Sequence, residues 1–302
     1  MDAVALSRQL RLGIVGFGRM GVRHWQTWTR LPGVEVVAIG DSDPAVRQWA
    51  SRQHLQCFAA IEPMFGMIDI AVIASPSSTH GECTRRLLNQ GIACLVEKPL
   101  APSSEECRQL MLCAKRNGVL LSVGQCERFN PGVVRVLGRL GDAPAMLEVF
   151  RHARGGAPAG SDVIEDLLVH DLDWLLFAGL HPSAVHLLSS TQRDGQLQAI
   201  ECRLEFTSGL GVYLSAGYDA ERRREVILSS PLRVPERISL EWQSEPGQTD
   251  PLTLQAQAFL QALQGAPSGI ASAEDAVAVT QICEQLRAQI LPAPACRISR
   301  SA

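Results

Sequence analysis

Three residues in two separate motifs could carry out chemistry in this chain: a lysine, an aspartate and a histidine. Lys98 lies between Glu97 and Pro99, directly after an apolar run that is typical of a buried strand. Because Pro99 restricts the backbone, the lysine is held in a rigid turn. An ammonium fixed beside a substrate hydroxyl would stabilise the alkoxide that develops as a hydride leaves its carbon. A solvated loop lysine is the alternative interpretation.

Asp166 and His170 belong to the second motif, a stretch over 162–177 with helical periodicity. Apolar residues fall on one face, and Asp162, Asp166, His170 and Asp173 fall on the other. The spacing predicts that Asp166 and His170 are neighbours one turn apart. A carboxylate beside an imidazole raises its basicity and fixes its tautomer, which suits a general base. The alternatives are a solvated polar stripe and a metal site, but a metal would require more histidine or cysteine ligands, so none is expected.

A glycine-rich turn near the start of the chain could hold a cofactor for these residues. The turn follows an apolar strand candidate over 10–15 and precedes a helical pattern over 21–31. Glycines let the backbone approach a pyrophosphate closely, and the helix N-terminus offers free N–H groups. The predicted pyrophosphate-binding turn comprises Gly16, Phe17, Gly18, Arg19, Met20 and Gly21.

Asp41 indicates which dinucleotide would bind. It follows the next apolar run, over 34–39, and lies 20 positions after Gly21. At the carboxyl end of a second strand, its carboxylate would accept hydrogen bonds from both hydroxyls of the adenosine ribose and would repel a 2′-phosphate. No arginine follows directly, which favours NAD over NADP. The alternative role of this aspartate is to cap a turn.

Strand and helix candidates alternate over the first 123 residues, with further buried strands at 69–74, 92–96 and 119–123. The alternation predicts an α/β fold with a doubly wound parallel sheet, that is, a Rossmann domain over 1–123. Such sheets bind ligands at the carboxyl ends of their strands. The loops at those ends supply the other predicted cofactor contacts: Ser75, Pro76, His80, Glu97 and Lys98.

From residue 124 the alternation stops, and we expect a second domain over 124–302 for substrate binding and oligomerisation. Strand candidates lie at 146–151, 184–189, 197–206, 210–218 and 224–229, and helix candidates at 252–263 and 273–290. The pattern predicts an α+β domain with a large, mostly antiparallel, open-faced sheet. A second copy of the chain is the usual cover for such a face, so we expect a homodimer or homotetramer.

Composition argues against several classes of protein. The chain has 302 residues and a formal net charge of −3, which gives no electrostatic case for binding nucleic acid or an anionic membrane. It contains no apolar run long enough to span a membrane, and its first residues lack the pattern of a signal peptide. Nine cysteines are scattered without a C-x-x-C motif, so we expect neither structural zinc nor disulfides, and a cytoplasmic location.

Taken together, these motifs resemble the Gfo/Idh/MocA oxidoreductases over most of the chain. The resemblance rests on the glycine turn, Asp41, Ala74-Ser75-Pro76 with His80, Glu97-Lys98-Pro99 and Asp166-x-x-x-His170. Within that family, the segments 124–131 and 166–173 are similar to those of UDP-N-acetylglucosamine 3-dehydrogenases. The resemblance implies oxidation of the sugar's 3-hydroxyl to a ketone by NAD. An aminotransferase can then install a 3-amino group, for example in lipid A synthesis.

The resemblance also implies roles for individual residues. Lys98 would contact the reacting hydroxyl, His170 would accept its proton, and Asp166 would orient His170 and balance its charge. All three would therefore bind substrate. The other expected substrate contacts, of which the arginines are candidates for the pyrophosphate, are Glu127, Arg128, Asn130, Arg151 and Arg154.

Three alternatives remain open from the sequence. The basic cluster over 151–156 lies in a glycine-rich stretch and could be an exposed loop rather than an anion contact. The substrate could be a free polyol such as an inositol rather than a nucleotide sugar. The alternative from another class is a non-catalytic NAD-binding regulator, which would not need a base and an alkoxide stabiliser.

Overall fold

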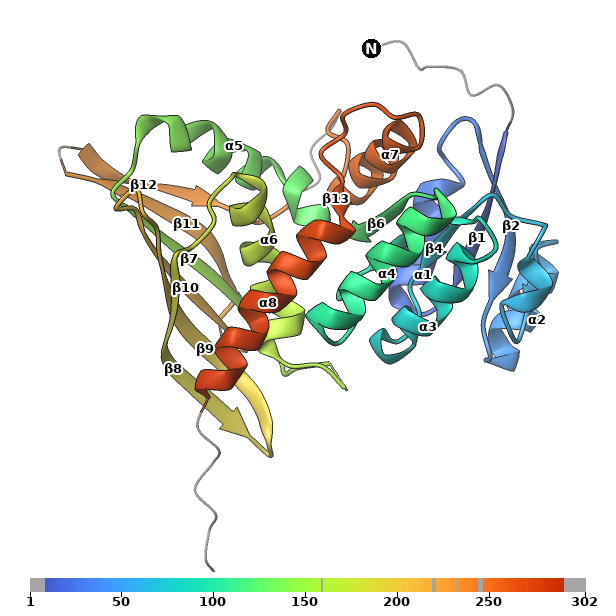
Figure 1. Ribbon diagram of the computed structural model, residues 1–302, viewed down its shortest axis with the longest axis horizontal. Coiled ribbons are helices and arrows are strands. Elements are labelled where there is room, and N and C mark those ends of the chain that lie inside the picture. Colours follow the sequence, from blue (N-terminus) through green and yellow to red (C-terminus); the bar gives the residue numbers. More distant parts are fainter. Residues whose placement is uncertain (1–8, 159, 219–220, 232, 244–246, 291–302) are drawn as a thin grey trace, which may run out of the picture.

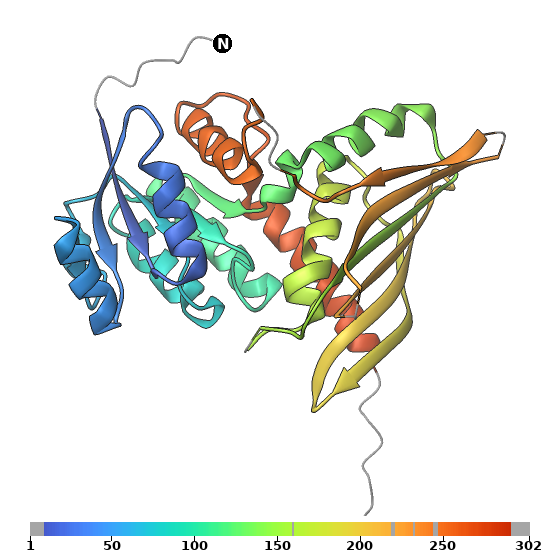
Figure 2. The same cartoon turned by 180° about the vertical axis from the view of Figure 1, so that it is seen from behind.

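Two sheets stand side by side in the computed structural model, with the long helix α8 (Ala273–Gln289) between them (Figures 1 and 2). The structure describes residues 9–158, 160–218, 221–231, 233–243 and 247–290. The start of the chain, on which the expectation of no signal peptide rests, and Cys296 lie outside these ranges. Within them, no helix is both long enough and apolar enough to cross a membrane.

The first sheet confirms the predicted doubly wound fold. Its strand order is β13-β6-β5-β4-β1-β2-β3, and the pairs among β1 to β6 are parallel. The strands are β1 (Leu10–Val15), β2 (Val34–Gly40), β3 (Gln56–Phe58), β4 (Ile70–Ile73), β5 (Ala93–Glu97) and β6 (Leu121–Gly124). The helices are α1 (Arg19–Trp28), α2 (Pro44–Arg52), α3 (Ser77–Leu88) and α4 (Ser104–Asn117), with a short η1 (Glu62–Met64). The central strands β4 and β5 are nearly continuous apolar runs because helices cover both faces of the sheet.

The order of the strands reverses between β1 and β4, which is where ligands of such sheets bind. The loops after these two strands touch closely. Gly16 has a φ of +84°, and a Cβ placed on it would lie 2.4 Å from the Cα of Ser75. Only glycine fits this position, because a side chain would collide with the backbone of the neighbouring loop.

Part of the C-terminal third of the chain returns to this first sheet. Strand β13 (Ala271–Ser272) pairs antiparallel with β6, and Phe259 of α7 (Pro251–Leu263) packs edge-on against Trp28 with ring centroids 6.2 Å apart. These residues therefore lie against the first sheet, although they fall within the second domain predicted over 124–302, and that domain division stays a prediction. The helical periodicity of α7 reveals a buried face but not which distant partner buries it.

The second sheet has the order β12-β11-β7-β10-β9-β8, and only the β7–β10 pair among those described is parallel. This confirms the predicted, mostly antiparallel sheet. The strands are β7 (Met146–Ala153), β8 (Ala184–Arg193), β9 (Gln196–Glu205), β10 (Gly211–Tyr218), β11 (Arg223–Ser230) and β12 (Arg233–Ser239).

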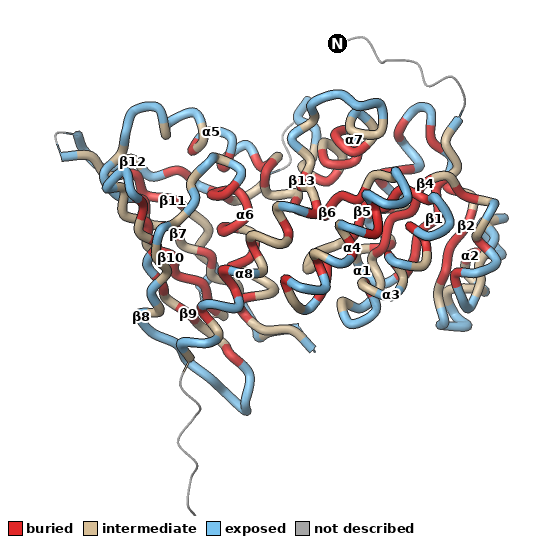
Figure 3. The backbone as a smooth tube through the Cα atoms, in the orientation of Figure 1, coloured by how far each residue is buried: buried red, intermediate tan, exposed pale blue. Residues whose placement is uncertain are grey.

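Helices α5 (Pro131–Arg139), α6 (Val169–Phe177) and α8 lie on one face of this sheet, where the buried residues concentrate (Figure 3). Alternation along the strands directs residues such as Leu147 and Val149 toward these helices. The opposite face carries polar side chains, including Glu201 and Tyr213, whose hydroxyl donates to that carboxylate over 2.6 Å. Short 3-10 helices η2 (Cys126–Phe129) and η3 (Leu140–Asp142) and the π-helix η4 (Ile164–Leu168) complete the structure.

Candidate active site

A cavity of about 670 Å³ lies between the two sheets, at the carboxyl ends of β4, β5 and β6. Most of the predicted site residues line it, although they come from distant parts of the sequence. Those from the elements around the first sheet are Arg19, Met20, Ser75, His80, Glu97 and Lys98, and those from the later part of the chain are Glu127, Arg151, Asp166 and His170.

The glycine turn beside this cavity has room for a pyrophosphate. A Cβ on Gly21 would lie 2.1 Å from the carbonyl oxygen of Gly16, so this glycine is needed by the turn itself. A Cβ on Gly18 would meet no atom within 4 Å, which leaves open space over the backbone. Helix α1 begins at the next residue without a side-chain cap, so its first N–H groups are available to phosphate oxygens. The residues present therefore fit a dinucleotide.

Asp41 is tied to this turn from the end of β2. One carboxylate oxygen accepts the backbone N–H of Phe17 at 2.7 Å, and the other accepts the N–H of Asp43 at 2.8 Å. Each carboxylate oxygen has a second lone pair, so the group can still accept hydrogen bonds from ribose hydroxyls. Its predicted contact with the ribose of NAD remains a prediction, and Asp41 also has the turn-holding role considered as the alternative.

His80 and Glu97 hold the loops around the cavity in place. The two ring nitrogens of His80, which is buried, lie 2.8 Å from the carbonyl oxygen of Ser75 and 2.7 Å from that of Pro99. Glu97 lies 2.8 Å from Nε2 of His24. Burial alone would raise the pKa of Glu97, but the His24 hydrogen bond and the charges of His24 and Lys98 lower it, so this carboxylate remains ionised.

Lys98 reaches across from the first sheet to the π-helix of the second. Its Nζ lies 3.1 Å from three acceptors: the carbonyl oxygens of Glu165 and Asp166 and Oδ1 of Asp166. These carbonyls are accessible because a π-helical turn is wider than an α-helical one and displaces the regular backbone bonding pattern. All three hydrogens of the ammonium thus have an acceptor, and a substrate hydroxyl would replace one of them.

Asp166 pairs with Tyr218 and Lys98, not with His170. The hydroxyl of Tyr218, the last residue of β10, donates to Oδ2 of Asp166 at 2.7 Å. Burial would raise the pKa of Asp166, but the charge of Lys98 and the hydrogen bonds from Tyr218 and Lys98 lower it overall. The predicted pairing of Asp166 with His170 is not formed among the described residues, because Lys98 and Tyr218 engage the two carboxylate oxygens of Asp166.

His170 lines the cavity as a neutral imidazole. Its Nδ1 is buried, and it has no hydrogen-bond partner among the described residues. Burial, followed by the positive charges of Lys98, Arg151 and Arg224, lowers the pKa of His170 well below its ordinary value of 6.5. The expected increase in its basicity by Asp166 is therefore wrong in direction. A neutral imidazole next to an ammonium can still accept a proton from a hydroxyl.

The pH profile of turnover should show this lowered pKa. A base acts only when unprotonated, so we expect kcat/KM to hold its neutral-pH value as the pH falls through 6.5 and to decline only in more acidic buffer. Steady-state kinetics between acidic and neutral pH would measure this dependence of kcat/KM on pH. An acidic limb centred at 6.5 or above would contradict the assignment of His170 as the base in this environment.

Tyr218 is a site residue that we did not predict from the sequence, because the signal was only its position at the end of a strand candidate. Replacing it with phenylalanine should lower kcat about threefold to tenfold, since one hydrogen bond that orients Asp166 is lost. The matched control is Tyr213→Phe, because Tyr213 belongs to the same strand but points away from the cavity toward Glu201. Equal kinetics for both variants would contradict a positioning role for Tyr218.

Two predicted substrate contacts, Arg128 and Asn130, are buried and do not line the cavity. Arg128 makes a two-pronged ion pair with Asp173, with both N–O distances at 2.7 Å. Asn130 caps α5 through the N–H of Gly132 and donates to the carbonyl of Leu240 at 2.9 Å. A charged, amide-rich segment has the same composition whether it binds a ligand or joins buried elements, so the contact of Arg128 and Asn130 with substrate stays a prediction. Arg154 is exposed and also lies outside the cavity lining.

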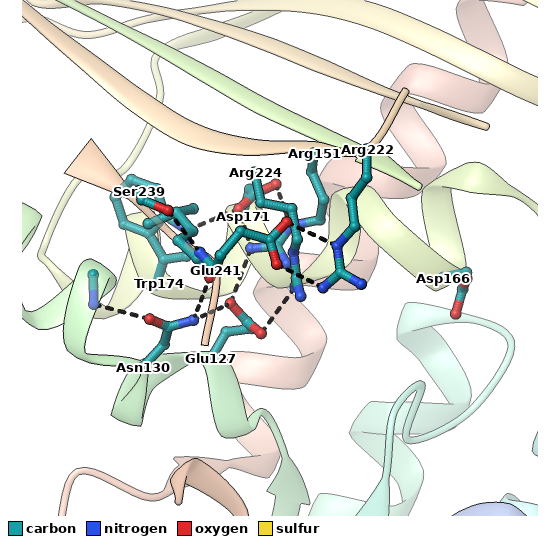
Figure 4. A network of polar contacts seen from close by, with 12 residues as sticks. Glu127, Asn130, Arg151, Asp166, Asp171, Trp174, Arg222, Arg224, Ser239 and Glu241 are labelled. Carbon is teal, nitrogen blue, oxygen red and sulfur yellow. Dashed lines mark hydrogen bonds and ion pairs between the residues drawn. The ribbon is translucent and has the colours of Figure 1, made fainter. Parts of the chain in front are cut away.

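Glu127 lines the cavity, but its carboxylate is occupied. Its two oxygens accept hydrogen bonds from Arg151 at 3.2 Å and from Arg224 at 3.0 Å (Figure 4). Burial would raise the pKa of Glu127, but the charges of these arginines lower it. Glu127 therefore positions arginines, and its direct contact with substrate remains a prediction.

Comparisons with known proteins indicate the family of the chain. Residues 10–125 match the model of an oxidoreductase family with an NAD-binding Rossmann fold, GFO_IDH_MocA. Inositol 2-dehydrogenase 2 of Saccharopolyspora erythraea is 31% identical over 72% of this chain and 70% of its own length. UDP-N-acetylglucosamine 3-dehydrogenase of Acidithiobacillus ferrooxidans is 29% identical over 57% of this chain and 56% of its own.

A solved structure of that UDP-N-acetylglucosamine 3-dehydrogenase has the same fold. It superposes with a TM-score of 0.82 at 23% identity, over 93% of this chain and 97% of the other. The matched sequence, the fold and the cofactor turn lead to the same conclusion. The chain belongs to the Gfo/Idh/MocA family and is an NAD-dependent oxidoreductase.

Proposed function

We propose that this protein oxidises the 3-hydroxyl of UDP-N-acetylglucosamine to a ketone, with NAD⁺ as the oxidant. The observation that carries the proposal is that Lys98 and a neutral His170 line one cavity beside the dinucleotide turn. A hydrogen-bond donor and a proton acceptor facing the same space suit the oxidation of an alcohol.

Each catalytic residue then has a defined task. Lys98 donates a hydrogen bond to the reacting oxygen and stabilises its developing negative charge. His170 takes the hydroxyl proton. Asp166 and Tyr218 hold Lys98 in place. Bound NAD⁺ would accept the hydride from carbon 3, so that loss of one proton and one hydride leaves the ketone.

Arginines on the cavity wall favour a nucleotide sugar over a free polyol. Arg151, Arg222 and Arg224 line the side formed by the second sheet, close enough to the site that two of them lower the pKa of His170. A neutral polyol offers these guanidinium groups only hydroxyls. An inositol remains the alternative substrate, since several inositol dehydrogenases are similar to this chain to the same degree.

The test is the formation of NADH by the purified protein with NAD⁺ and a panel of substrates. We expect turnover with UDP-N-acetylglucosamine and a 3-keto product by NMR, and no turnover by His170→Asn. Turnover of myo-inositol or scyllo-inositol with none of the UDP-sugar would support the polyol alternative. Binding of NAD⁺ without turnover of any substrate in the panel would support the alternative of a non-catalytic NAD-binding regulator.

The proposal also covers the reaction that would consume the product, and the location and assembly of the protein. A 3-keto sugar is the substrate that an aminotransferase would require to install a 3-amino group, as in the synthesis of lipid A or another glycoconjugate. We propose a cytoplasmic homodimer or homotetramer that assembles through the outer face of the second sheet. The polar side chains on that face support an interface that uses hydrogen bonds and ion pairs.

A further inference from the structure

Two arginines face each other directly on neighbouring strands beside the cavity. Arg151 of β7 and Arg224 of β11 are register partners in the antiparallel pair, and both line the cavity. Like charges at directly opposed positions destabilise a sheet. A fold keeps such a pair only where other groups offset the repulsion, so the partners of these arginines determine what the pair can do.

The carboxylates nearby do not satisfy both guanidinium groups. Asp171 accepts two hydrogen bonds from Arg151, both at 2.7 Å, and Glu127 bridges Arg151 and Arg224 (Figure 4). Arg151 is 1% exposed, yet its Nη1 is buried without a partner among the described residues. Among the described residues, the guanidinium of Arg224 donates a hydrogen bond to Glu127 alone, at 3.0 Å.

The electrostatics also indicate that the nearby carboxylates do not fully balance the positive charge of Arg224. Burial and the positive charge of Arg151 lower its pKa, and Glu127, Asp171 and Glu241 offset this only in part. Glu241 is itself committed to Arg222, at 2.8 Å from Nε. Arg224 is partly buried, with 22% of its side chain exposed, and a cation in this situation is stabilised by any anion that supplements its partner.

We propose that Arg224, supported by Arg151, binds an anionic oxygen group on the substrate, either a phosphate or a carboxylate. This rests on the proposed function, because it names the part of the substrate that the second sheet recognises. A guanidinium provides a fork of N–H donors that matches the oxygens of both groups. Lys98 and His170 lie on the same cavity, so an anion at Arg224 would hold the sugar against them.

Isothermal titration calorimetry on the NAD-loaded protein tests this without relying on turnover. The probes are UDP for the diphosphate, glucuronate for the carboxylate, and myo-inositol as the neutral ligand. We expect at least one anion to bind more tightly than inositol, and Arg224→Gln to weaken that binding about 10- to 100-fold, as for the loss of a charged hydrogen bond. The probe that shows this loss identifies the source of the anion.

Two further variants make the result decisive. Arg237→Gln removes the same charge from an exposed ion pair with Glu225, outside the cavity, and should bind every probe like the wild type. Arg224→Lys keeps the charge and should bind the anion more tightly than Arg224→Gln, which also covers a folding defect in the glutamine variant. The proposal is overturned if neither anion binds better than inositol, or if Arg224→Gln weakens inositol as much as the anion. Failure of UDP-N-acetylglucosamine to turn over would instead count against the proposed function alone.

Discussion

Lys98→Met is expected to lower kcat about 10²- to 10³-fold, the loss typical of removing one preorganised donor from a developing oxyanion. Methionine keeps much of the length of the side chain but neither its charge nor its N–H groups. The hydroxyl oxygen would then become negative beside His170 without compensation. Binding of NAD⁺ should change little, because the glycine turn and Asp41 lie on other loops.

Steady-state kinetics together with NAD⁺ titration would measure both effects. Lys115→Met is the matched control, since Lys115 is 60% exposed, pairs with Glu274 and lies outside the active-site cavity. It should retain wild-type kcat. Unchanged kcat in Lys98→Met, with substrate bound normally, would show that the ammonium does not act on the reacting oxygen.

Features that depend on neighbours along the chain could be predicted from the sequence. The glycine turn and the strands β1, β2, β4, β5 and β6 of the first sheet each follow from a local pattern of apolar residues and glycines. The carboxyl ends of parallel strands gather at one edge, so the same pattern placed Ser75, His80 and Lys98 around one cavity.

Features that depend on distant partners could not be predicted. The stretch over 164–168 shows helical periodicity in the sequence but forms a π-helix, and Asp166 within it accepts a hydrogen bond from Tyr218, 52 positions away. Likewise, Arg128 and Arg151 are both arginines in polar segments. Arg128 is buried away from the cavity, whereas Arg151 lines it. Residue type and spacing do not distinguish a buried ion pair from a ligand contact, because both require charges of opposite sign.

Arg128→Ala is expected to lower the free energy of unfolding by about 3–5 kcal/mol, the usual cost of removing one partner from a buried ion pair. Arg128 of η2 contacts two other helices. It pairs with Asp173 of α6 and stacks 4.5 Å above the ring of Phe177 in the same helix, and its Nη2 lies 3.1 Å from Oδ2 of Asp275 at the start of α8. Without it, Asp173, which is 1% exposed, would be left buried beside the like charge of Asp275.

Urea unfolding of Arg128→Ala and matched variants would measure this cost from the shift in midpoint. Arg135→Ala removes an arginine that is 61% exposed and paired with Glu236, so it should cost no more than about 1 kcal/mol. The double variant Arg128→Met/Asp173→Leu should recover much of the loss, because it removes both charges together. A cost no larger than that of Arg135→Ala would contradict the structural role of Arg128. A raised KM for substrate with unchanged stability would instead support Arg128 as the substrate contact that the sequence predicts.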